Sequence, residues 1–147
     1  MAADRDGSLK FAKVNDNQPF GPSWTTTWFK VHLQFPTFAQ PGETWVFEFD
    51  CENEGLVIDG ETLLPVTAFS GKAERSEYLI KIPDFDSDSL MKKNYKHFFY
   101  IECANNEMFG CGFPGQIDPP DNNKYFHLKK SDLVLPNWEA KKLAYDF

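Results

Sequence analysis

The sequence has no long apolar run, few sulfur-containing side chains and a deficit of positive charge. Among 147 residues, three are cysteine and three are methionine, and 15 Lys and Arg stand against 22 Asp and Glu. No apolar stretch approaches the roughly 18 residues of a membrane-spanning helix, so we expect no membrane partner. The net charge of −7 repels phosphate backbones and argues against nucleic acid as a partner.

Signals of the secretory route are also missing. The N-terminus is charged from Asp4 onward and carries no apolar stretch of the kind found in secretory signals. None of the asparagines lies in an N-x-Ser/Thr sequon. Because the three cysteines are an odd set, we interpret them as buried free thiols in a reducing compartment. The expected location is cytoplasmic, without classical secretion.

Aromatic side chains are abundant, at 16% of the chain with 15 Phe, which favours sheets over a helical bundle. Residues 26–35 alternate between an apolar and a mostly polar face, as in a half-buried strand. Residues 44–50 alternate again, with Trp45, Phe47 and Phe49 on one face and Val46, Glu48 and Asp50 on the opposite face. Residues 77–82 and 97–104 supply two further strands. Asp59-Gly60 between apolar runs predicts a hairpin, since both residue types tolerate positive φ. The predicted fold class is therefore all-β, an antiparallel β-sandwich of jelly-roll or galactose-binding-like type.

The chain divides into three predicted parts. Residues 1–24 form a polar N-terminal segment that leads into the fold, and residues 25–127 form the β-sandwich. Residues 128–147 are predicted to be a linker and the start of a helix, with Asn137 as its N-cap. The helical pattern has no stop signal, so we expect it to lead toward a domain missing from this chain.

Catalytic groups are hard to assign from these residues. Asp50, Glu52 and Glu54 lie close together, and a glycosidase needs two carboxylates that flank the scissile bond. Acidic residues at the end of a strand are, however, usually solvated. The three histidines lack the spacing of metal ligands. We therefore predict no catalytic residue and no metal ligand in this chain.

A carbohydrate site is an alternative for a β-sandwich. Sugars offer apolar faces that stack on aromatic rings, and hydroxyl groups that bond to amides. The candidate sugar contacts are Trp24, Trp28, Asn105 and Asn106. Trp45 alternates with Phe47 and Phe49 and is predicted to lie in the core instead. The alternative function is thus a stand-alone carbohydrate-binding module.

Four ordered blocks of the sequence resemble glycoside hydrolase family 38 α-mannosidases of the cytosolic and fungal vacuolar type. The similarity runs from about residue 19 to the end, and a further block, LPVTAFSG at residues 64–71, resembles the fungal vacuolar branch. The four blocks are FGPSWTTTWFKV at residues 20–31, FDCENEGLV at 49–57 followed by Asp59-Gly60, FYIECANN at 99–106 with Phe109-Gly110, and DLVLPNWEA at 132–140.

The resemblance implies the N-terminal accessory domain of a metal-dependent, retaining exo-α-mannosidase. Such enzymes release terminal α-mannose from oligosaccharides, with a metal that grips the sugar and an aspartate nucleophile. Both lie in the family's catalytic domain, and no position of this sequence matches them. The resemblance therefore implies zinc or another divalent metal for the parent enzyme, no cofactor in this chain, and no activity of the chain alone.

The resemblance also implies partners. They are the catalytic domain of the same protein, further subunits of a homo-oligomer and, in fungal relatives, an autophagy receptor that delivers the enzyme to the vacuole. Mannosides themselves are expected to bind weakly if at all. Exposed apolar side chains near the C-terminus would pack on the rest of the enzyme. The candidates for this packing are Trp138, Leu143, Tyr145 and Phe147.

Overall fold

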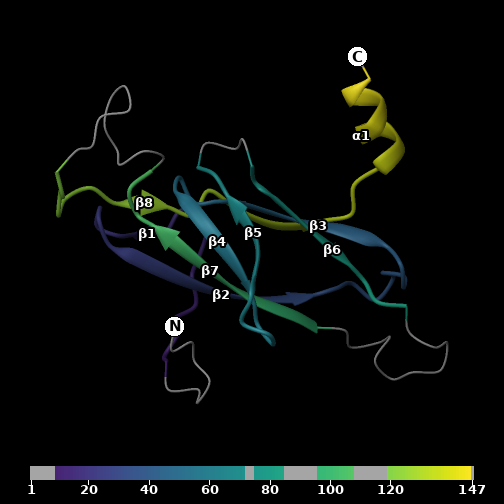
Figure 1. Ribbon diagram of the computed structural model, residues 1–147, viewed down its shortest axis with the longest axis horizontal. Helices are drawn as coiled ribbons and strands as arrows, with labels where there is room; N and C mark the ends of the chain where they lie inside the picture. Colours follow the sequence, from purple (N-terminus) through teal and green to yellow (C-terminus); the bar gives the residue numbers. More distant parts are fainter. Residues whose placement is uncertain (1–8, 72–74, 85–95, 108–118, 147) are drawn as a thin grey trace.

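The fold was analysed in a computed structural model, which describes residues 9–71, 75–84, 96–107 and 119–146. Within these residues the chain forms three antiparallel sheets and a C-terminal helix (Figure 1). One sheet has four strands in the order β2-β7-β4-β5, a second has three in the order β6-β3-β9, and β1 pairs with β8. The elements are β1 (Pro19–Phe20), β2 (Thr26–Gln34), β3 (Thr44–Asp50), β4 (Glu54–Asp59), β5 (Pro65–Phe69), β6 (Glu77–Lys81), β7 (Lys96–Ala104), β8 (Phe126–His127), β9 (Lys130–Val134) and α1 (Trp138–Tyr145).

The core lies between the four-stranded and three-stranded sheets and is largely aromatic. Phe29 of β2 meets Phe49 of β3 edge to face, with ring centroids 5.6 Å apart. Phe47 of β3 meets Phe99 of β7 in the same way at 5.2 Å. All four rings are buried and belong to one cluster. The predicted antiparallel β-sandwich is confirmed.

The long predicted strands agree with β2, β3, β6 and β7 to within one residue at each end. The expected helix is also present, and the side chain of Asn137 accepts a hydrogen bond from the backbone N–H of Ala140. This N-cap bond satisfies one of the donors that the first turn of a helix leaves unpaired.

The hairpin between β4 and β5 forms as predicted, but the expected conformation of Gly60 is wrong. Leu63, not Gly60, has positive φ in this turn, at 58°. The Asp59 carboxylate holds the turn because it accepts hydrogen bonds from the backbone N–H groups of Glu61 and Thr62 and from the Thr62 hydroxyl. The Thr62 contacts are the main reason why the pKa of Asp59 lies below its usual value.

Two strands lie outside residues 25–127, the range expected for the sandwich. β9 lies where a linker was expected, and it pairs with β3 from Val46 to Asp50. β1 lies in the N-terminal segment and pairs with β8. The ring of Phe20 in β1 also packs edge to face on Phe29, with centroids 5.3 Å apart. The sandwich thus takes in residues from both flanking parts.

Val46 was expected on the polar face of its strand, but it is 1% exposed. Its register partners are Leu79 of β6 and Val134 of β9. The three side chains therefore make an apolar row on the outer face of the three-stranded sheet, because register partners point to the same side.

Within the described residues, no helix is long and apolar enough to cross a membrane.

Candidate functional site

The candidate sugar contacts Trp24 and Asn106 meet at one end of the four-stranded sheet. The Trp24 backbone N–H donates to the Asn106 side-chain oxygen at 2.9 Å and to the backbone oxygen of Asn105 at 3.0 Å. Trp24 adopts a positive φ of 61° and its side chain is exposed. This corner therefore presents one indole ring beside one amide side chain.

Asn105 belongs to the same corner, but its side chain is buried. Its amide nitrogen donates to the hydroxyls of Thr25 and Thr27, at 2.8 and 2.9 Å. Its side-chain oxygen has no hydrogen-bond partner within the described part of the chain. These contacts join the end of β7 to β2, so the Asn105 side chain supports the sheet and does not face a surface ligand.

Trp28 lies apart from these residues, on the outer face of β2 opposite Glu102 of β7. It lines a groove of about 570 Å³ between β2 and the N-terminal segment. None of Trp24, Asn105 and Asn106 lines this groove. The structure thus does not gather the four sugar-contact candidates into one site.

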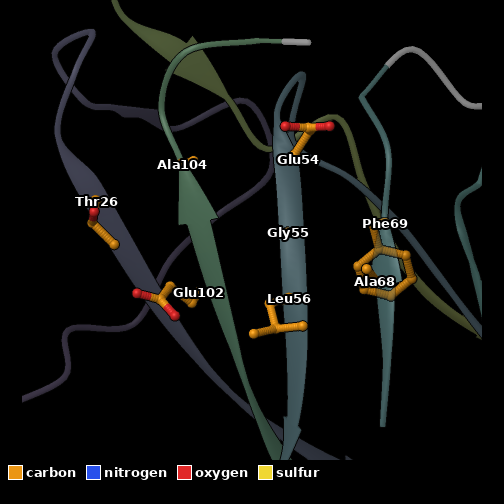
Figure 2. Close-up of a pocket in the computed structure, with 8 residues that line it drawn as sticks. All are labelled: Thr26, Glu54, Gly55, Leu56, Ala68, Phe69, Glu102 and Ala104. Atoms are coloured by element: carbon orange, nitrogen blue, oxygen red, sulfur yellow. The ribbon is translucent and has the colours of Figure 1, made fainter. Parts of the chain in front are cut away.

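A second, shallower pocket of about 340 Å³ lies on the outer face of the four-stranded sheet. Figure 2 shows Glu54 and Leu56 on β4, with Glu102 on the neighbouring β7. Among the described residues, neither carboxylate has an ion-pair or hydrogen-bond partner. Leu56, the register partner of Glu102, is exposed beside them. The surface is acidic and apolar, and the sequence reasoning did not identify it as a site.

Two of the three carboxylates considered for catalysis have structural contacts. Asp50 accepts the backbone N–H of Glu52 at 2.9 Å. Glu52 accepts the backbone N–H of His127 at 2.7 Å and lies 3.7 Å from the Lys129 ammonium. Glu54 faces the shallow pocket described above. In the described ranges, no three His, Cys, Asp or Glu side chains come together as metal ligands would.

His97 of β7 is a partly buried titratable group that the sequence did not single out. Its Nε2 lies 3.4 Å from the Tyr78 hydroxyl, and its ring lies against Phe99 with centroids 5.6 Å apart. Burial lowers the pKa of His97 below its ordinary value of 6.5, and the nearby Asp59 and Glu61 carboxylates offset part of this effect.

We expect the chain to lose stability as pH falls below about 6.5. The unfolded chain then binds a proton at His97 that the folded chain binds only at lower pH, so protonation favours unfolding. His97→Gln should flatten this dependence, measured as the free energy of unfolding in urea across the pH range. The exposed His32→Gln is the control. An identical slope in the wild type and His97→Gln would contradict the expectation.

Of the residues predicted to pack on another domain, Trp138, Leu143 and Tyr145 lie on α1, which projects away from the sheets (Figure 1). Leu143 is 58% exposed and Tyr145 is 79% exposed, while Trp138 is less so. Phe147 lies outside the described residues. No residue of α1 is buried. The helix presents its large apolar side chains outward.

Polar contacts attach α1 to the sandwich. The Trp138 indole N–H donates to the backbone oxygen of Thr44 at 3.1 Å. The Lys141 ammonium forms an ion pair with Glu77 of β6 at 2.6 Å and lies over the Trp138 ring. The start of the helix is therefore oriented on the three-stranded sheet, while its C-terminal half extends beyond it.

Comparison with known proteins identifies relatives across the whole domain. A family model described as the jelly roll domain of alpha-mannosidase matches residues 2–134. An alpha-mannosidase of Saccharomyces cerevisiae is 50% identical over 98% of this chain, which covers 12% of the relative. Alpha-mannosidase G of Dictyostelium discoideum is 34% identical over 92% of the chain, covering 12% of that protein. Human alpha-mannosidase 2C1 is 32% identical over 99% of the chain, covering 13% of that protein.

These matches confirm the resemblance drawn from the sequence blocks. They agree with the antiparallel sheets and the sandwich core, and they cover the strands from β1 to β9. The chain spans about an eighth of the length of each of these relatives. The chain belongs to the family of alpha-mannosidase jelly roll domains.

Proposed function

We propose that this chain is the N-terminal accessory domain of a metal-dependent, retaining exo-α-mannosidase that releases terminal α-mannose from oligosaccharides. Its role is structural: it packs on the catalytic part of the same protein and on neighbouring subunits of a homo-oligomer. The observation that carries the proposal is α1, whose exposed Leu143 and Tyr145 would be costly to leave in water.

The proposal assigns catalysis and metal binding to the part of the enzyme outside this chain. Zinc, or another divalent metal, would need three protein ligands in a catalytic site. The described residues bring no such group together, and the proposal places the metal ligands in the catalytic part of the enzyme. We include in the proposal a cytoplasmic location and delivery to the vacuole by an autophagy receptor, on the strength of the sequence resemblance.

Leu143→Asp combined with Tyr145→Asp should separate the domain from its catalytic partner. The test co-expresses this chain with the yeast relative from which the matching segment has been removed. We expect co-purification and hydrolysis of p-nitrophenyl α-mannoside with the wild-type chain. The double variant should co-purify at least about tenfold less, because burying each large apolar side chain contributes about 1.5–3 kcal/mol and 1.4 kcal/mol is a factor of ten.

A matched control uses two apolar side chains of similar exposure that do not belong to α1. Phe38 is 66% exposed and Leu64 is 63% exposed, and Phe38→Asp with Leu64→Asp should leave co-purification unchanged. If the wild-type chain fails to co-purify, the accessory-domain proposal fails. Saturable binding of α-mannose by the isolated chain, centred on Trp24 and Asn106, would favour the carbohydrate-binding alternative.

A further inference from the structure

Two of the three cysteines come together in the core, although 52 positions separate them in sequence. Cys51 follows β3 of the three-stranded sheet, and Cys103 lies in β7 of the four-stranded sheet. Their sulfur atoms are 3.5 Å apart, and both side chains are buried. Both thiols are free. The pair therefore bridges the two layers of the sandwich.

The Cys51 and Cys103 sulfur atoms are close enough to form a disulfide after a small movement, and their surroundings leave room for it. A disulfide has its sulfur atoms about 2.05 Å apart, so the two sulfurs would have to approach by about 1.5 Å. Gly55 lies opposite Cys103 in the sheet. A side-chain carbon at Gly55 would stand 3.4 Å from the Cys103 sulfur, so the absent side chain leaves room beside this thiol.

We propose that Cys51 and Cys103 form a modification site at which an oxidant of the low-molecular-weight disulfide class, such as oxidised glutathione, creates a disulfide between the two sheets. The thiolate of one cysteine attacks a glutathione sulfur, a mixed disulfide forms and one glutathione leaves. The thiolate of the second cysteine attacks the protein sulfur of the mixed disulfide and expels the second glutathione. Two protein thiols are oxidised, and one oxidised glutathione is reduced to two thiols.

Cys51 is the thiol that reacts first, because it lies in a turn rather than inside a strand. The next residue, Glu52, has a positive φ of 64°. The contacts of the Glu52 carboxylate with His127 and Lys129 hold this turn in place. Cys103 lies in β7, which pairs with strands on both sides. Local opening of the turn at Cys51 therefore exposes a sulfur without breaking the central sheet.

Formation of the Cys51–Cys103 disulfide should be slow, and its rate should rise as the pH rises. The hydrogen bond with Cys51, followed by burial, raises the pKa of the Cys103 thiol well above its usual value. In the mixed disulfide the Cys51 thiol is gone, but Cys103 is still a buried thiol. Since the thiolate is the nucleophile, the second step should be faster at higher pH throughout the range in which the chain is folded. This separates the pair from a rapid redox sensor, which needs an exposed thiol of low pKa.

The test uses the chain with Cys111→Ser, which leaves only these two thiols. The folded chain is incubated with oxidised glutathione at mildly alkaline pH. We expect loss of both thiols, no retained glutathione in the intact mass, and a proteolytic peptide that links Cys51 to Cys103. The midpoint of thermal unfolding should rise by roughly 5–15 °C and return when a reductant is added during unfolding.

Single variants identify the roles of the two cysteines. Cys103→Ala should retain glutathione on Cys51, because the second thiol is absent, whereas Cys51→Ala should react more slowly. Glu52→Ala should accelerate oxidation several-fold, and Glu61→Ala, in a different turn, should not. The proposal is overturned if both thiols persist in the folded chain under conditions that link them in the unfolded chain, or if the linked chain melts lower. An unchanged rate in Glu52→Ala would overturn Cys51 as the first thiol to react.

Discussion

Phe47→Ala should lower the free energy of unfolding by about 3–5 kcal/mol. Phe47 is 1% exposed, and its ring lies within 5.2 to 6.5 Å, centroid to centroid, of Phe49, Phe69 and Phe99. Phe69 and Phe99 belong to the four-stranded sheet and Phe49 to the three-stranded one. Removing the ring leaves a cavity at the point where the two layers meet. Equilibrium unfolding in urea measures the loss, which is a large share of the stability of an ordinary domain.

The same truncation at the surface provides the control. Phe38 is also a phenylalanine and touches Trp45, but it is 66% exposed, so Phe38→Ala should cost less than about 1 kcal/mol. Phe47→Leu should fall between the two, since it keeps part of the buried volume. A loss below about 1 kcal/mol for Phe47→Ala would mean that the two sheets do not depend on this ring for their contact.

Local periodicity predicted the long strands well because burial on one face forces alternation. Residues 26–35 and 44–50 alternate clearly, and both are strands in the structure. The two-residue strands β1 and β8 are too short to show a period, and they form only because residues far apart in sequence pair. β9 shows the same limit, since its pairing with β3 crosses most of the chain.

The face that a residue occupies was less predictable where both faces of a strand are covered. Val46 sits between Trp45 and Phe47, so alternation assigns it to solvent. It is buried nevertheless, because the outer face of its sheet carries Leu79 and Val134 beside it. Alternation along one strand does not show whether neighbouring strands cover its outer face.

The candidate site was predicted only in part. Sequence chemistry selected Trp24 and Asn106, which do lie together, but it also selected Asn105, whose side chain is buried between threonines. Amide chemistry is the same in both positions, so only the three-dimensional surroundings distinguish a ligand contact from a core contact. The proximity of Cys51 and Cys103 likewise depends on how two sheets pack, and no spacing in the sequence indicates it.

The β4–β5 hairpin was predicted correctly for a reason that the structure does not support. Gly60 was expected because of its tolerance of positive φ, but it does not use that conformation. It lies against β7 instead, and its N–H donates to the backbone oxygen of Phe98 at 3.2 Å. A side-chain carbon there would stand 2.5 Å from that oxygen and 2.3 Å from the Phe98 ring. The position requires glycine because of a close approach between two segments of backbone.

Gly60→Ala should therefore lower the free energy of unfolding by about 2–3 kcal/mol, because the Phe98 ring can move aside but the backbone oxygen of β7 cannot move without disturbing the central strand. Urea unfolding measures the loss. Glu61→Ala, at the next position of the same turn, should change the value by no more than about 0.5 kcal/mol. In a Phe98→Ala background the cost of Gly60→Ala should shrink but persist, because the ring is gone and the oxygen remains. If the cost disappears completely there, the ring alone requires glycine; if Gly60→Ala is harmless in the wild type, the turn does not approach β7 closely.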